Sequence, residues 1–189
     1  MDEDILELKR QLVHLLNGSA IAAGIYLLKP VVGLWILSPL IIALITLHLL
    51  PKVRPDHKVM NHLMNHFERK KDILVFPFRG AIFFGWGIMF PIILLDAPYA
   101  AAVVLILSVG DSVSTLVGRR YGKIRIGDKS LEGSVAFLVC AWAASSILID
   151  PTHALVLSVV GMIIELFSFA DDNIVIPASL SLLARITSP

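Results

Sequence analysis

Long runs of apolar residues, separated by short polar stretches, constrain the fold of this 189-residue chain more than any other feature. A helix that crosses the hydrocarbon core of a bilayer needs about 20 mainly apolar residues. Charged residues make up only 16% of the chain, against about 25% in a typical soluble domain. Because a core this small cannot bury so much apolar surface, lipid must solvate part of it. The sequence therefore predicts an all-α fold, a polytopic membrane helix bundle that forms a single domain over residues 1–189.

About seven transmembrane helices are expected, one for each apolar run, and the last run is the shortest. They cover Leu12–Leu28, Val31–Leu50, Ala81–Leu95, Pro98–Val117, Leu131–Ile149, Ala154–Ala170 and Ile174–Ile186. Between the second and third runs lies a polar stretch, Pro51–Arg79, in which apolar residues recur at helical spacing among basic residues. This pattern is typical of a helix that lies in the membrane interface, so one interfacial helix is expected there.

Lysine and arginine residues are concentrated in alternate connections between the apolar runs. Two precede the first run, seven lie within Pro51–Arg79 and five lie between Arg119 and Lys129, which leaves only Lys29 and Arg185 elsewhere. The positive-inside rule makes this side cytoplasmic, so the N-terminus is expected in the cytoplasm. A formal net charge of +1 gives no indication of a nucleic-acid partner, and the oligomeric state is left open.

A first set of polar residues enters the first apolar run. Glu7, Arg10, His14 and Gly18 are spaced by three, four and four residues, which places them on one helical face. Such a stripe is suited to contact a phosphate or a lipid hydroxyl. Alternatively, Arg10 extends to the interface and pairs with Glu7, while His14 packs between helices. The sequence leaves both interpretations open.

A second set surrounds Asp111 and the connection that follows its apolar run. One helical face carries Asp111, Thr115, Gly118 and Gly122, and Lys129–Gly133 begins the next run. Glycines let a backbone approach phosphates closely, and basic side chains neutralise phosphate charge. The glycines can equally serve helix packing, but that alternative does not explain a carboxylate within a membrane span. The pattern therefore favours a phosphate-binding site.

A third set of polar residues lies at the end of the sixth run and in the connection to the seventh. Glu165, Ser168 and Asp172 are spaced by three and four residues, with Asp171 and Asn173 adjacent. Carboxylates gathered at one membrane edge repel one another unless a cation compensates them, and Mg²⁺ prefers such oxygen ligands. Alternatively, Asp172 or Asn173 caps the following helix. Both interpretations remain open.

Taken together, these motifs resemble the CTP-dependent lipid kinases, the family of dolichol kinase, phytol kinase and the CTP-dependent diacylglycerol kinase. The family pattern Glu-x-x-Arg-Lys-x-x-His is matched by Glu7, Arg10 and His14, with Gln11 in place of the lysine. The other matched positions are Gly110, Asp111, Gly118 and Gly122; Lys129, Ser130, Gly133 and Ser134; and Asp172, Asn173 and Pro177. The resemblance covers nearly the whole chain.

The resemblance implies that the γ-phosphoryl group of CTP is transferred, with Mg²⁺, to the hydroxyl of a membrane lipid alcohol such as a polyprenol. It implies catalytic roles for Asp111, Arg10 and Lys129, and Mg²⁺ coordination by Asp111 and Asp172. His14 and Glu165 are expected on the side of the lipid hydroxyl. Nucleotide binding is expected at Gly110, Gly118, Arg119, Gly122, Lys123, Ser130 and Gly133. Whether Asp111 binds the metal or accepts the alcohol proton is left open.

Two other functions are weighed against this one. A CDP-lipid synthase also brings CTP to a lipid at the cytoplasmic face, but its Pro-Gly-His-Gly-Gly and Asp-Arg-x-Asp signatures are absent from this sequence. A small transporter would predict inverted repeats and charges near the bilayer centre. This chain shows no repeat, and its charges lie near one edge of the expected spans.

Overall fold

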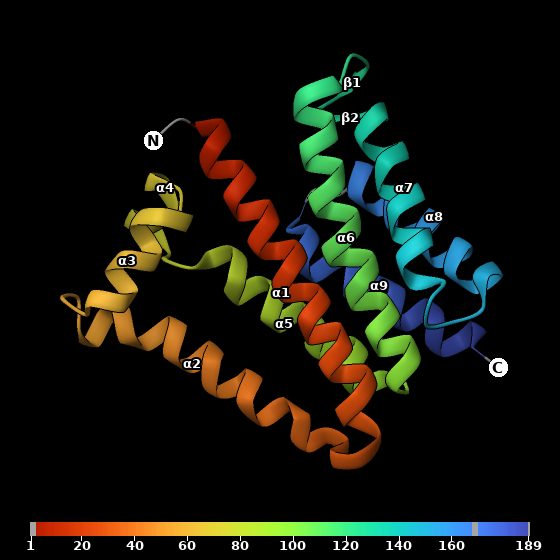
Figure 1. Ribbon diagram of the computed structural model, residues 1–189, viewed down its shortest axis with the longest axis horizontal. Coiled ribbons are helices and arrows are strands. Elements are labelled where there is room, and N and C mark those ends of the chain that lie inside the picture. Colours follow the sequence, from red (N-terminus) through yellow and green to blue (C-terminus); the bar gives the residue numbers. More distant parts are fainter. Residues whose placement is uncertain (1–2, 168–169, 189) are drawn as a thin grey trace.

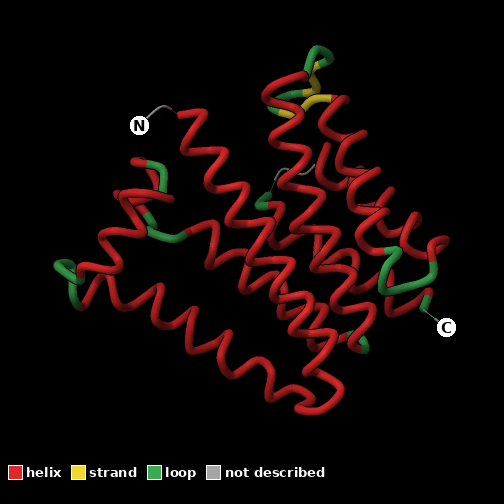
Figure 2. Tube along the Cα trace, viewed as in Figure 1, coloured by secondary structure: helices red, strands yellow, loops and turns green. Residues whose placement is uncertain are grey.

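The computed structural model describes residues 3–167 and 170–188, and helices dominate it (Figure 2). The helices pack into a bundle from which one long helix projects (Figure 1). The elements in chain order are α1 (Glu3–Val32), the 3₁₀ helix η1 (Gly33–Ile36), α2 (Leu37–Val53), α3 (Lys58–Phe67), α4 (Lys70–Val75), α5 (Arg79–Leu94), α6 (Ala97–Tyr121), β1 (Arg125–Ile126), β2 (Lys129–Ser130), α7 (Leu131–Ser145), α8 (Pro151–Phe167) and α9 (Asp172–Thr187).

The all-α expectation is confirmed for the described residues, apart from the short hairpin that joins α6 to α7. Its strands β1 and β2 are antiparallel and pair Arg125 with Ser130 and Ile126 with Lys129. Gly127 in the hairpin turn has φ +59°, a left-handed conformation that glycine adopts without steric cost. Strands this short carry no periodic signal, so the apolar pattern of the sequence did not predict them.

Helix α6 lies at the centre of the bundle, with α1, α5, α7, α8 and α9 packed around it (Figure 1). Its first half is apolar and fully buried from Ala100 to Val104, and alanine side chains let neighbouring helices approach closely. Gly110 continues this close approach, because a Cβ atom there would lie only 2.7 Å from the ring of Phe137 on α7. The contact between α6 and α7 therefore depends on small residues along α6.

Helix α2 projects away from the other helices (Figure 1). Leu44 is its buried residue, and it packs with Phe78 and Ile82 in a small separate core. Ile42 and Ile45 on the same helix remain exposed. Exposed apolar surface of this extent indicates contact with lipid or with another protein.

The helical state of the apolar runs is confirmed, because each of the seven expected spans lies mainly within a helix. Two stretches, Asp4–Val53 and Ala97–Tyr121, are long and apolar enough to cross a membrane. Shorter apolar helices occupy Arg79–Leu94, Leu131–Ser145 and Pro151–Phe167. The number of membrane crossings stays a prediction.

The single interfacial helix expected within Pro51–Arg79 is two short helices, α3 and α4. They are separate because the backbone is extended at Glu68 and Arg69. The apolar side of α3, which includes Leu63 and Met64, packs against the small core around Leu44. Part of its apolar side therefore contacts α2 and α5, and its position in a membrane interface stays a prediction.

Candidate active site

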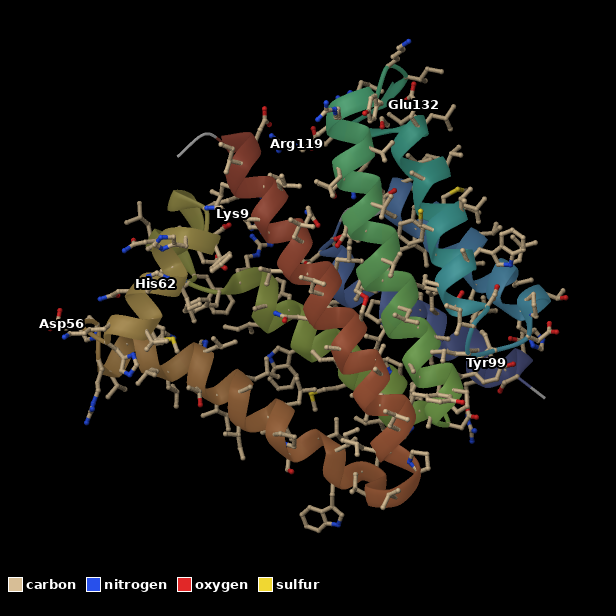
Figure 3. The ribbon with its side chains drawn as sticks, in the orientation of Figure 1. Lys9, Asp56, His62, Tyr99, Arg119 and Glu132 are labelled. Atoms are coloured by element: carbon tan, nitrogen blue, oxygen red, sulfur yellow. The ribbon has the colours of Figure 1, made fainter. Side chains whose placement is uncertain are left out.

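The three polar sets recognised in the sequence meet at one end of the bundle. This end is formed by the N-terminal half of α1, the C-terminal half of α6, the hairpin, the end of α8 and the start of α9. Figure 3 labels Arg119 and Glu132 at this end and Tyr99 at the other. We call it the polar end. Ion pairs of Lys129 with Glu165 and Asp172, and the approach of His14 to Asp111, link its polar side chains across segments that are far apart in the sequence.

Lys129 joins the second polar set to the third. Its ammonium Nζ lies 2.8 Å from Oε1 of Glu165 and 2.8 Å from Oδ2 of Asp172. Burial acts to lower the pKa of Lys129, but the surrounding carboxylates, Asp172 foremost among them, outweigh burial and raise that pKa above its usual value. The Lys129 side chain is therefore a cation at neutral pH.

His14 and Asp111 join the first polar set to the second. Nε2 of His14 lies 3.8 Å from Oδ2 of Asp111, which is longer than a hydrogen bond. The His14 ring packs edge-on against Phe84 of α5, with 4.8 Å between ring centroids. A ligand oxygen that bridges the two side chains would satisfy both.

Glu7 is nearly buried and holds two arginines together. Its Oε2 atom accepts hydrogen bonds from Arg10 at 3.1 Å and from Arg69 at 2.7 Å, while Oε1 accepts one from Gln11 at 2.8 Å. Arg69 lies between α3 and α4, so this carboxylate ties the short helices to α1. The pairing of Arg10 with Glu7, weighed above as an alternative, is present, and it leaves Arg10 beside the pocket described next.

A pocket of about 160 Å³ opens between α1, α5, α6 and α9, and residues from the end of α3 close one side. Arg10, His14, Asp111, Glu68 and Asn173 are among the residues that line it. Burial raises the pKa of the Glu68 carboxyl above its usual value. Nε2 of His14 and Oδ1 of Asn173 are buried atoms without a hydrogen-bond partner in the described part of the chain. Because buried polar atoms normally have partners, these two atoms mark the pocket as a candidate binding site.

Glu165, expected beside the lipid hydroxyl, is only 2% exposed and, like Lys129 and Asp172, is not among the residues that line this pocket. Its carboxylate, carried by α8, faces α6 and α7 and contacts Lys129. Oε1 accepts a hydrogen bond from Ser114 at 3.1 Å, and Oε2 accepts one from Ser134 at 3.3 Å. The structure therefore places Glu165 against Lys129 and away from the pocket.

The glycines expected at a nucleotide site lie in the contact between α6 and the segment that follows it. A Cβ atom on Gly118 would lie 2.9 Å from Oγ of Ser130, and one on Gly133 would lie 2.7 Å from the carbonyl oxygen of Ser114. At Gly122 it would lie 2.7 Å from Cβ of Ser130. These three positions, like Gly110, permit close packing of protein against protein.

Ser130 has a structural role in the same contact. Its Oγ accepts a hydrogen bond from the backbone N–H of Gly133 at 3.1 Å, so it caps the start of α7. Arg119 pairs with Asp4 of α1 at 2.6 Å. Lys123 is exposed beside an open pocket between the end of α6 and the start of α7. Of the expected phosphate-binding cations, Arg10 and Lys129 lie at the polar end's interior and Arg119 and Lys123 at its surface.

The carboxylates expected to hold Mg²⁺, Asp111 and Asp172, both act electrostatically on Lys129. Within residues 3–167 and 170–188, no group of three His, Cys, Asp or Glu side chains is arranged to hold a metal ion. Mg²⁺ in nucleotide sites commonly takes one or two carboxylates and completes its coordination with water and phosphate oxygens. Asp111 and Asp172 fit that requirement as hard oxygen donors.

Several residues of the polar end were missed or misplaced by the sequence patterns. Ser114, which the sequence patterns did not single out, donates a hydrogen bond to Glu165, while the role expected for Thr115 stays a prediction. The three-residue spacing from Asp111 to Ser114 was the signal available. Asp171 caps α9 through the backbone N–H of Asn173 at 3.2 Å, so neither of the two expected capping residues serves that role. Ser168 lies outside the described residues.

Comparison with known proteins gives two relatives. No family model matches the chain, and no solved structure matches it significantly. Dolichol kinase of Saccharomyces cerevisiae is 31% identical over 106 residues, which cover 49% of this chain and 20% of the yeast protein. The chain therefore spans about one fifth of the length of that kinase.

The second similarity extends over almost the whole chain. The uncharacterized protein MJ1137 of Methanocaldococcus jannaschii is 31% identical over 183 residues, which cover 90% of this chain and 88% of the archaeal protein. The match therefore extends over nearly the full length of both proteins. This chain therefore belongs to the same protein family as MJ1137 of Methanocaldococcus jannaschii.

Proposed function

We propose that this protein is a CTP-dependent kinase that transfers the γ-phosphoryl group to the hydroxyl of a membrane lipid alcohol of the polyprenol type. The observation that carries the proposal is the meeting of His14, Asp111 and Lys129 at the polar end of an otherwise apolar bundle. The similarity of about half the chain to a dolichol kinase supports the same substrate class. The motifs quoted above add CTP as the donor.

The proposed setting is a membrane with the polar end on its cytoplasmic side, crossed by about seven helices. Exposed apolar side chains on α1, α2, α5, α7 and α8 support contact with lipid. The concentration of basic residues in the connections at the polar end supports the orientation. A long isoprenoid alcohol presents its hydroxyl near the interface, which is the depth proposed for the polar end.

In this proposal the acceptor hydroxyl enters the pocket lined by His14, Asp111 and Asn173. The unpartnered Nε2 of His14 and Oδ1 of Asn173 provide one site that accepts or donates a hydrogen bond and one that accepts. The alcohol has one donor and an acceptor oxygen, so it can satisfy both atoms. Glu165, buried behind Lys129, does not contact the alcohol.

Phosphoryl transfer depends mainly on positioning and on neutralising charge. We assign Arg10 and Lys129 to the phosphate oxygens, because both are cations at the interior of the polar end. The alcohol oxygen bonds to the γ-phosphorus as the bond to the bridging oxygen of the departing CDP breaks. Asp111 either accepts the alcohol proton or, with Asp172, holds Mg²⁺. When bound, Mg²⁺ would neutralise triphosphate charge and stabilise the transition state.

Purified protein incubated with γ-labelled CTP and a panel of lipid alcohols tests the proposal. The label is expected in the lipid, and CDP is expected to accumulate at the same rate. The panel should include a polyprenol, phytol and diacylglycerol, with ATP and GTP as alternative donors. Removal of Mg²⁺ by a chelator should stop transfer.

Each other result has a distinct meaning. Release of pyrophosphate with formation of a CMP-bearing lipid would replace the kinase with a cytidylyltransferase. Absence of any transfer from CTP with all alcohols would overturn the proposal. Transfer to diacylglycerol alone would keep the reaction and change the acceptor class.

A further inference from the structure

The carboxylate of Glu165 is buried in a helix that is otherwise mainly apolar. Burying an ionised carboxylate is costly unless hydrogen bonds and an opposite charge compensate it. Three possible donors surround this one: Oγ of Ser114 at 3.1 Å, Nζ of Lys129 at 2.8 Å and Oγ of Ser134 at 3.3 Å. Each serine hydroxyl shares its single proton with a backbone carbonyl oxygen at 3.2 Å, so Lys129 is the main partner. The three donors come from α6, β2 and α7, so Glu165 on α8 connects four segments of the chain.

The position of the Lys129 ammonium depends strongly on such contacts. Its side chain has a flexible four-carbon stem, and it begins from a strand of only two residues. Glu165 and Asp172 each accept one of its three N–H donors. In the described part of the chain no acceptor is assigned to the third donor, and the side chain is 32% exposed. The ammonium is thus fixed on one side and accessible on another.

The two anchors of Lys129 differ in how firmly they are held. The Asp172 side chain is 19% exposed and that of Glu165 is 2% exposed. Asp172 lies at the first residue of α9 and is one of the two carboxylates assigned above to Mg²⁺. Glu165 is bound by two serine hydroxyls that belong to other helices. Of the two carboxylates, that of Glu165 is therefore the more firmly fixed.

We infer that Glu165 is a positioning residue. Its carboxylate, itself held by Ser114 and Ser134, fixes the Lys129 ammonium at the point where that ammonium contacts the transferred phosphoryl group. This inference rests on the proposed function. Glu165 itself touches neither the alcohol nor the nucleotide. Its role differs from the contact with the lipid hydroxyl that the sequence led us to expect.

Glu165→Gln tests the inference in the kinetic assay, because it keeps the shape and removes the charge. We expect kcat to fall on the order of 10²-fold, since a small displacement of a positioned group has effects of that size. KM for the lipid alcohol should stay within about twofold of wild type, because the acceptor pocket is unaffected. Glu165→Asp, which restores the charge, should recover part of kcat. A kcat near wild type in monodisperse Glu165→Gln protein would overturn the inference.

Ser158→Ala is the matched control, because Ser158 is another buried polar residue of α8 and makes no hydrogen bond through its hydroxyl to the described residues. It should leave kcat unchanged. If Glu165→Gln does not yield folded protein, Ser134→Ala removes one hydroxyl from the same carboxylate. It should lower kcat about fivefold, as expected for one hydrogen bond, and an unchanged kcat there would overturn the inference.

A thermal-stability cycle separates this inference from the proposed function, because it needs no substrate. Lys129→Met leaves both Glu165 and Asp172 without their cation, and we expect a lower Tm in detergent. In a Glu165→Gln background the same substitution should lower Tm by less than half as much. Additive Tm changes, with wild-type turnover intact, would overturn the inference alone. Absence of CTP-dependent turnover in the wild-type protein would overturn the proposed function whatever the cycle shows.

Discussion

An acidic residue lies beside each end of α6, but one is exposed and bonds to the backbone, whereas the other is buried and bonds to side chains. At the Ala97 end, Asp150 is exposed, and its Oδ1 accepts hydrogen bonds from the backbone N–H groups of Thr152 at 2.9 Å and His153 at 3.2 Å. These backbone bonds, that of His153 foremost, lower the pKa of Asp150 below its usual value. At the Tyr121 end, Glu165 is buried and bound to side chains from three other segments.

The difference teaches what distinguishes a candidate site from a helix terminus. Asp150 satisfies backbone donors left open at the start of α8, which any helix requires. Glu165 satisfies no backbone group, and its burial is costly without Lys129. Polar residues at both ends of the expected spans look alike in the sequence. Glu165 differs because it is buried and its partners come from distant segments. Of the two residues compared, only Glu165 therefore indicates a candidate site, at the Tyr121 end of α6.

The proposed orientation predicts an all-or-none difference between the two ends. Lys123 near the polar end and Thr152 at the opposite end are both exposed. Single cysteines at these positions, in a Cys140→Ala background, should react with an impermeant thiol reagent from opposite faces of the membrane. Lys123→Cys should react only from the cytoplasmic face. Labelling of both cysteines from one face would contradict the topology and the comparison built on it.

Asp111→Asn should have the largest effect on activity. The substitution keeps the shape of a pocket-lining side chain and removes its charge, so turnover should fall on the order of 10²-fold or more, the range associated with a positioned acid–base group. Activity per folded molecule, measured on the monodisperse fraction, is the deciding quantity. Asp150→Asn is the control at the opposite end and should leave turnover unchanged. Near-wild-type activity of Asp111→Asn would remove this residue from the site.

Glu7→Gln should loosen the attachment of α3 and α4 to α1. It removes the charge that pairs with Arg10 and Arg69, and hydrogen bonds to charged groups contribute about 1.5–3 kcal/mol. Because glutamine keeps part of this bonding, amide exchange in Lys58–Val75 should become roughly fivefold faster. Asp150→Asn should leave exchange in this segment unchanged. Equal exchange in Glu7→Gln and wild type would show that other contacts hold the segment.

Tyr99→Phe should have the smallest effect. The Tyr99 hydroxyl lies 2.9 Å from Nδ1 of His153 and links α6 to α8 at the end away from the site. Loss of one hydrogen bond of this kind costs about 1 kcal/mol, so a slightly lower Tm with unchanged turnover is expected. A fall in turnover as large as that of Asp111→Asn would show that both ends of α6 serve the reaction.

Much of the fold could be predicted from the sequence, because apolar periodicity is a local property. Each apolar run became helical, and the basic connections set one end of the bundle apart from the other. The first two polar sets were also visible as residues on single helical faces, whereas Glu165 and Asp172 of the third lie on different helices, α8 and α9. The hairpin Arg125–Ser130 and the division of α3 from α4 were not, since strands of two residues and an extended pair such as Glu68 and Arg69 have no periodic signature.

By itself, the sequence determined which segments are helical, which residues carry charge within apolar surroundings, and the composition that points to a membrane. Only the tertiary structure decided how those residues are used. Gly118 and Gly133 lie in the contact between α6 and the segment that follows it. Glu165 bonds to Lys129 and does not line the pocket. The physical reason is that helical spacing places a side chain on a face of its own helix. Which faces then meet, and which charges pair, depends on the packing of helices that are far apart in the chain.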